Sequence, residues 1–100
     1  MSVYMSLRVD ADPAKFEEVA ARHKDTMLAI AERAKAQGCI HHRFAAQDGQ
    51  IVAIDEWESP EAFQRFFESE QDIPKLFEEV GVTGRPQPEF FRPIDVGDSF

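Results

Sequence analysis

Cysteine is nearly absent from this chain of 100 residues, which contains only Cys39. One cysteine can form neither an intramolecular disulfide nor a thiolate metal cluster, so nothing in the sequence indicates an oxidising compartment. Long apolar runs are absent too: no segment approaches the roughly 18 residues of a membrane span, and the first residues lack the basic and apolar stretches of a secretion signal. These absences predict a cytoplasmic protein.

Positive charge is scarce as well. The chain has 11 Lys and Arg residues against 19 Asp and Glu residues, which gives a formal net charge of −8. A surface of this sign repels phosphate backbones and anionic lipid headgroups, which bind to clusters of Lys and Arg. Neither nucleic acid nor a membrane is therefore an expected partner.

The composition is that of a globular protein, with 43% hydrophobic and 30% charged residues. A chain of this length suffices for one hydrophobic core but not for two. No internal repeat or linker interrupts the sequence. We therefore predict a single domain over residues 1–100.

Four segments either alternate apolar and polar residues or are rich in β-forming residues, as strands are. They are residues 3–9, 39–46, 51–57 and 89–96. Asp48-Gly49 provides the turn of a hairpin between the second and third segments. Pro93 limits the last segment to the edge of a sheet.

Two segments have the spacing and the end signals of helices. The first begins at Asp12-Pro13, where an N-cap oxygen precedes a proline, and continues as one long helix to Gly38. The second begins at Ser59-Pro60 in the same way, restarts at Asp72 and ends at Gly81.

The resulting order, βαββαβ, predicts an α+β protein with a ferredoxin-like fold. With right-handed crossovers, the antiparallel sheet has the strand order 4-1-3-2 and both helices cover one face. The other face, called the bare face below, has no covering layer. Its side chains are therefore the first candidates for a functional surface.

Alternation along the two central strands predicts which side chains reach the bare face. Val52 and Ile54 are assigned to the helices, and the predicted bare-face residues are Tyr4, Ser6, Arg8, Ala53, Asp55 and Trp57. A solvated face does not need the aromatic members, and a dry core does not favour the charged ones. Pairing of two sheets around a mixed pocket accounts for both kinds of residue.

The run from Asp55 to Phe63, DEWESPEAF, together with the strand start at Gly38-Cys39, resembles the dimeric α+β barrel superfamily, in particular antibiotic-biosynthesis-monooxygenase-like domains. The resemblance covers nearly the whole chain. It implies a homodimer, in which two sheets pack face to face and enclose a pocket for a small molecule. Because the superfamily includes cofactor-free monooxygenases, haem-degrading enzymes and isomerases, the resemblance defines the fold better than the reaction.

Two patterns of that superfamily are missing here. Where many members carry His-x-x-Ser-x-His in the second helix, this chain has Phe66, Ser69 and Gln71. Where haem-degrading relatives carry Asn, Trp and His, the matching positions hold Ser6 or a close neighbour, Phe66, and about Leu76. None of these side chains can ligate haem iron, so no haem and no other cofactor is expected.

His41 and His42 are neighbours on a predicted strand, so they point to opposite faces and cannot bind one metal ion together. No metal site is predicted. If Ile40 and Phe44 face the helices, His41 and Arg43 reach the bare face. His41 is then a candidate general base, although an ordinary strand histidine is the simpler interpretation.

The candidate catalytic residues are therefore His41 and Asp55. The candidate substrate-binding residues are Tyr4, Ser6, Arg8, Arg43, Trp57 and Phe66. Asp55 and Arg8, on neighbouring central strands, form the best candidate pair for a polar substrate group, unless they only neutralise each other. His23, on the apolar side of the first helix, is expected to be a core or boundary residue with a hydrogen-bond partner.

These observations predict a cofactor-independent monooxygenase-like protein that acts on or binds a small aromatic or quinol-type molecule in a pocket between sheet and helices. A base would deprotonate a phenol or enol, and the carbanion would react with dioxygen. The alternative is a non-catalytic dimeric barrel that binds a ligand or has a regulatory or stress-related role, which the missing second-helix histidines favour. The sequence alone leaves open whether the protein is an enzyme.

Overall fold

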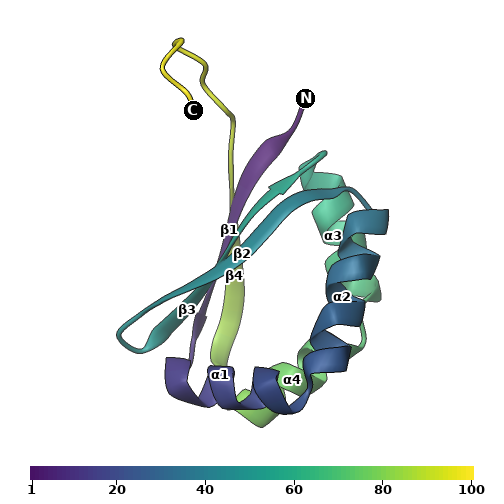
Figure 1. Cartoon of the computed structure of the whole chain (residues 1–100), viewed down its shortest axis with the longest axis vertical. Helices are drawn as coiled ribbons and strands as arrows, with labels where there is room; N and C mark the ends of the chain where they lie inside the picture. The colour runs from purple at the N-terminus through teal and green to yellow at the C-terminus, as the bar shows by residue number, and fades with distance from the viewer.

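A four-stranded antiparallel sheet with four helices on one face makes up the protein, whose computed structural model describes all 100 residues (Figure 1). The elements are β1 (Val3–Asp10), α1 (Pro13–Arg22), α2 (Lys24–Ala36), β2 (Cys39–Gln47), β3 (Gln50–Trp57), α3 (Pro60–Ser69), α4 (Asp72–Val80) and β4 (Thr83–Phe91). The strand order β2-β3-β1-β4 is the predicted order 4-1-3-2 read from the other edge. The ferredoxin-like α+β fold is thus confirmed.

The predicted helix starts and the predicted end at Gly81 are also confirmed. The Asp12 side chain accepts a hydrogen bond from the Ala14 N–H at 3.0 Å, and Ser59 accepts one from the Ala62 N–H at 3.1 Å. A proline follows each of these caps, where its missing N–H costs nothing. Gly81 ends α4 with φ of 87°, a conformation that favours glycine.

The predicted single long helix is wrong, because the chain leaves helical geometry at His23 (φ −114°, ψ 40°). In Figure 1, α1 crosses one end of the sheet and α2 turns to run along it. The His23 ring bonds Glu79 of α4 at 2.8 Å, and Arg22 reaches the same carboxylate at 3.0 Å. These long-range contacts hold the bend. His23 is thereby confirmed as a boundary residue with a hydrogen-bond partner.

The predicted bounds of the last strand are wrong: β4 spans Thr83–Phe91 rather than residues 89–96. It contains Pro86 and Pro88, which precede the predicted strand. β4 pairs only with β1, so positions without an N–H can face its unpaired side. The edge position is confirmed, but Pro93 lies beyond the strand, in a tail that extends away from the sheet (Figure 1).

The two central strands differ in how well their faces were predicted. Met5, Leu7 and Val9 of β1 are buried against the helices, as expected. On β3 the assignment is wrong by one residue: Asp55 is buried on the helix side, whereas Ile54 is 46% exposed on the bare face. Because Met5 is paired with Asp55 in the sheet, the two side chains share a face. Ala53 and Trp57 are likewise buried beneath the helices rather than on the bare face.

Candidate functional site

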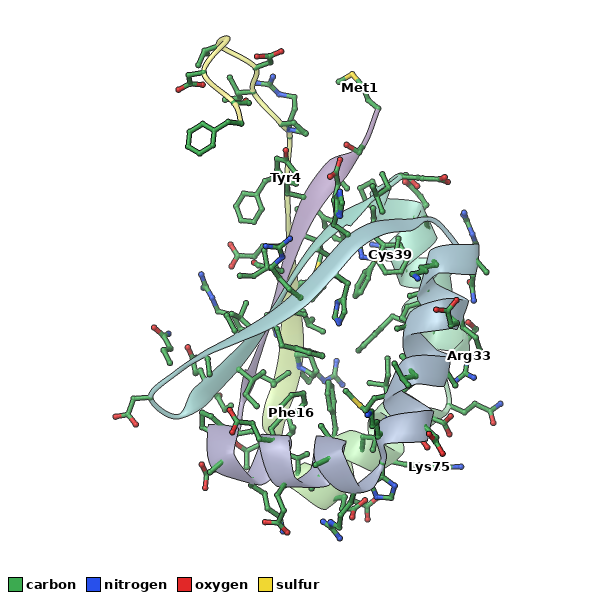
Figure 2. All side chains as sticks on the ribbon, viewed as in Figure 1. Met1, Tyr4, Phe16, Arg33, Cys39 and Lys75 are labelled. Carbon is green, nitrogen blue, oxygen red and sulfur yellow. The ribbon has the colours of Figure 1, made fainter.

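A cavity of about 360 Å³ lies between the sheet and the helices. Its wall is apolar, since 21 of its 25 lining residues are hydrophobic. Aromatic rings come from every layer around it: Phe16 of α1, Phe44 of β2, Trp57 of β3, Phe63 and Phe66 of α3, and Phe77 of α4. Figure 2 shows Phe16 and Cys39 on the side of the sheet that faces the helices. The cavity is within the size range of small-molecule sites, about 300–1,000 Å³.

Helix α3 forms one wall of this cavity. Ala62, Phe63 and Phe66 are buried on one face of the helix, and the rings of Phe63 and Phe66 each lie 5.4 Å from the Trp57 ring. The indole is 1% exposed. Trp57 is therefore a fixed part of the wall, with its N–H available only to groups inside the cavity.

Polar chemistry in the cavity centres on Asp55, a buried carboxylate of β3. Its Oδ1 lies 2.7 Å from Nδ1 of His42, and its Oδ2 accepts a hydrogen bond from the Trp57 indole N–H at 2.9 Å. The sheet explains this arrangement, because His42 is paired with Asp55 across the hairpin and Trp57 follows on the same face two residues later. The other polar lining residues are Lys35 and His41.

The geometry places a proton on Nδ1 of the His42 ring. A carboxylate can only accept hydrogen bonds, so Nδ1 of His42 carries the proton that Asp55 receives. In the neutral ring Nε2 keeps a lone pair, and it makes no hydrogen bond within the chain. A ring held in this way can take a proton from a molecule in the cavity, while the carboxylate stabilises the imidazolium that forms.

The His42 ring is also held from its other side. Phe44 meets it edge-on at 4.7 Å between ring centroids, and Phe16 packs on Phe44 at 4.9 Å. Among the lining residues of β2, Ile40 and Phe44 are 47% and 43% exposed, and the His42 side chain is 38% exposed. The cavity therefore opens along β2, beside the candidate base.

Cys39 borders the same cavity but is not a nucleophile there. Burial raises the pKa of its thiol to about 11, and the negative charge of Asp55 adds to the effect. Its Sγ lies 3.3 Å from the His41 carbonyl oxygen, to which the thiol donates. The site thus contains a protonated thiol rather than a thiolate.

Four of the residues proposed from the sequence border this cavity: His41, Asp55, Trp57 and Phe66. The last three do so between sheet and helices, and not on the bare face. The signal for their neighbour His42 was present in the hairpin, where a two-residue loop at Asp48-Gly49 pairs Gln47 with Gln50 and so places His42 opposite Asp55.

The other proposed residues lie elsewhere. Tyr4, Ser6, Arg8 and Arg43 are on the bare face, where Figure 2 shows Tyr4 pointing away from the helices. The proposed pairing of Arg8 with Asp55 is wrong, because Arg8 pairs with Glu89 of β4 at 3.3 Å on the opposite side of the sheet.

His41, the histidine favoured by the sequence, occupies a different position from His42. It is paired with Glu56, next to an irregularity between Cys39 and His41, and it borders the cavity without a bond to Asp55. The structure contains no group of three or more His, Cys, Asp or Glu side chains suited to a metal ion. None of its helices has the length and apolar character needed to cross a membrane.

Comparison with known proteins shows the fold. No protein-family model matches the sequence, and no curated protein matches it closely enough to count. Among solved structures, SnoaB of Streptomyces nogalater, a cofactor-independent oxygenase, is 21% identical, with a TM-score of 0.62 and 98% of each chain covered. The ActVA-Orf6 monooxygenase of Streptomyces coelicolor, solved with nanaomycin D, is 18% identical with a TM-score of 0.67, over 95% of this chain and 89% of the other.

Rv0793 of Mycobacterium tuberculosis is 16% identical with a TM-score of 0.61, over 98% of this chain and all of the other. At such identities the likeness concerns the fold. The resemblance to antibiotic-biosynthesis-monooxygenase-like domains is confirmed at that level.

Proposed function

We propose that this protein, which has the fold of cofactor-independent oxygenases, is itself a monooxygenase that needs no bound cofactor. Its substrate is a small aromatic molecule with an acidic hydroxyl group, and His42 with Asp55 is the base. The observation that carries the proposal is the 2.7 Å contact between His42 and a buried carboxylate in an otherwise apolar cavity. Paired groups of this kind are typical of proton transfer sites.

The reaction begins when Nε2 of His42 removes the hydroxyl proton of an enol or phenol. The resulting carbanion reduces dioxygen and binds it, and the imidazolium returns the proton to give a hydroperoxide. His42 then removes the remaining C–H proton, and the C=O bond forms as the O–O bond breaks. The hydroxide that leaves takes this proton from His42 and becomes water. A CH₂ group and O₂ give a carbonyl group and water, so the substrate supplies all the electrons and no other reductant is needed.

The surrounding residues support this sequence of steps. Asp55 balances the charge of His42 when the ring is protonated, and the Trp57 N–H fixes the second carboxylate oxygen. The apolar wall keeps water from protonating the carbanion before oxygen arrives.

Aerobic turnover of anthrone- and hydroquinone-type probes, followed by oxygen uptake and product mass, tests the proposal. We expect His42→Ala and Asp55→Asn to lower kcat/KM by about 10²–10⁴-fold, the usual contribution of a general base. Asp48→Asn, in the exposed hairpin turn, is the control for the change in charge and should behave like the unsubstituted protein.

His41→Ala decides between the two histidines, and its effect should remain below about tenfold because the ring has no bond to Asp55. An unchanged rate in His42→Ala would refute the assignment of the base. Binding of the probes without any oxygen uptake would instead support the non-catalytic alternative.

We also propose that the protein is a homodimer that pairs through the bare face. Tyr4, Ile54 and Phe91 are each almost half exposed there, and together they form an apolar surface on neighbouring strands. The Ser6 hydroxyl between them is buried without a hydrogen-bond partner. A second sheet would cover the apolar side chains and could provide that partner.

A further inference from the structure

The charges around the cavity are unequal. Asp55 is a buried carboxylate, and no unpaired cation balances it. Lys35 is the only lysine or arginine among the lining residues, but its side chain is 69% exposed and pairs with Glu32 at 3.2 Å. An anion inside the cavity would therefore face another anion across an apolar space, without a partner of opposite charge.

The hydrogen-bonding groups point to the same selection. The three N–H or S–H donors near Asp55 are all in use: His42 Nδ1 and the Trp57 indole donate to the carboxylate, and Cys39 donates to the His41 carbonyl. His41 also borders the cavity, but its pairing with Glu56 places its side chain toward the other face of the sheet. The remaining group is the lone pair of Nε2 in the neutral His42 ring, which is an acceptor. A hydroxyl group satisfies that lone pair, whereas a carboxylate or sulfonate would bury acceptors with no donor.

The whole molecule adds to this effect, because its net charge of −8 disfavours the approach of anions. We infer that the cavity admits uncharged hydrogen-bond donors such as phenols and excludes ligands that carry a carboxylate, sulfonate or phosphate. Combined with the proposed function, on which this last step rests, the substrate enters neutral and becomes an anion only when His42 takes its proton.

Two fluorescent probes with the same aromatic skeleton test the inference. N-phenyl-1-naphthylamine is neutral, and 1-anilinonaphthalene-8-sulfonate differs from it by one sulfonate group. Trp57 is the only tryptophan of the chain and lines the cavity, so energy transfer from it reports binding at this site. We expect the neutral probe to bind at least about tenfold more tightly, the ratio that one unsatisfied buried charge would produce.

Asp55→Asn should reverse the preference in part. The asparagine amide can donate to His42 Nδ1, which moves the ring proton to Nε2 and turns the acceptor in the cavity into a donor. The sulfonate should then bind about tenfold more tightly than to the unsubstituted protein, while the neutral probe changes by less than about threefold. Asp48→Asn makes the same change in net charge at an exposed turn and should leave the ratio of the two affinities unaltered.

Circular dichroism shows whether Asp55→Asn is folded. If it is not, the ratio of the two probe affinities in the unsubstituted protein still tests the inference. Equal or tighter binding of the sulfonate, or no binding of the neutral probe, would overturn the inference. An equal change of the affinity ratio in Asp55→Asn and Asp48→Asn would also overturn it. These measurements need no turnover. A confirmed preference without oxidation of any phenol therefore refutes only the proposed function, and oxidation of a phenol without the preference refutes only this inference.

Discussion

Asp55 acts on three side chains at once, although it is a single buried carboxylate. It accepts hydrogen bonds from His42 and Trp57, and its charge adds to the burial that raises the pKa of Cys39. A buried charge is costly unless its oxygens have donors, and here each oxygen has one. The site therefore depends on this residue for its ring orientation, its charge and the state of its thiol.

The Cys39 thiol should resist alkylation in the folded protein. With a pKa of about 11, it carries very little thiolate at pH 8. Compared with a free cysteine, reaction with iodoacetamide should be slower by about a hundredfold at that pH. The rate should rise as the pH approaches the pKa, as followed by mass spectrometry.

The same protein unfolded in urea is the control and should react at the rate of a free thiol. Asp55→Asn should accelerate the reaction at pH 8, because it removes the charge that disfavours the thiolate. If the folded and unfolded proteins reacted equally fast at pH 8, the buried position of Cys39 would be wrong.

At the scale of the residue, the sequence identified Asp55 and Trp57 as candidates but placed them on the wrong face. β3 has apolar side chains on both faces, including Val52 and Ile54 on one and Ala53 and Trp57 on the other, so alternation could not decide between them. The register of the hairpin could have shown which face each side chain of β3 occupies, because the turn and not the hydrophobicity of the residues fixes the pairing.

Among the elements, helix α2 borders the cavity with one of its sides. Its other side is held by an ionic cluster. Both oxygens of Glu70 accept hydrogen bonds from Arg33 at 2.8 Å, and Arg33 also reaches Asp72 at 3.1 Å. Glu70 ends α3, so the cluster ties α2 to the junction of α3 and α4. The cluster thereby stabilises α2, which packs partly against the cavity and not only against apolar side chains.

The stability given by this cluster should depend on pH. The hydrogen bonds from Arg33 hold the pKa of the Glu70 carboxyl below its usual range. The folded state therefore favours the ionised form. Its contribution is complete above the unfolded pKa of about 4.3, and it is lost as the pH falls through the lower folded value.

Glu70→Gln should thus lower the free energy of unfolding at pH 7, and the difference from the unsubstituted protein should shrink as the pH is lowered below about 4. Urea unfolding at a fixed protein concentration measures both. Glu78→Gln, on the exposed side of α4 and without an ion pair, should show no such dependence. A difference that grew on acidification would contradict the assigned direction of the pKa.

At the scale of the element, local signals predicted well and distant contacts did not. The caps at Asp12 and Ser59 and the turn at Gly81 lie within a few residues of the ends they define, so the sequence contains them. The break at His23 is held by Glu79, which is 56 positions away in the sequence. Such a contact leaves no local pattern.

For the whole molecule, the sheet separates two surfaces for which we propose different roles. The cavity lies on the helix side, and the bare face carries the half-exposed side chains of Tyr4, Ile54 and Phe91. The tail beyond β4 extends past the sheet of its own chain (Figure 1). Ile94 and Val96, both in this tail, are exposed. A second copy on the bare face would cover the apolar side chains without touching the cavity.

Native mass spectrometry should show the unsubstituted protein at twice the protomer mass of 11.4 kDa. Ile54→Arg should shift it to the monomer, because Ile54 lies between Ser6 and Arg43 in the middle of the bare face. A second sheet would have to bury the new charge there, beside an arginine of the same sign. Leu28→Arg makes the same substitution at an exposed position of α2 and should leave the dimer intact.

The separation of the cavity from the bare face also predicts how the monomer binds the neutral probe. Since Ile54 points away from the cavity, the Ile54→Arg monomer should still bind N-phenyl-1-naphthylamine with an affinity within about threefold of the dimer, as expected for separate sites. A dimer that persisted in Ile54→Arg, or a monomeric unsubstituted protein, would refute pairing through the bare face. A monomer that had lost the probe would show that the cavity needs the second copy, and the sheet would then couple the two surfaces instead of separating them.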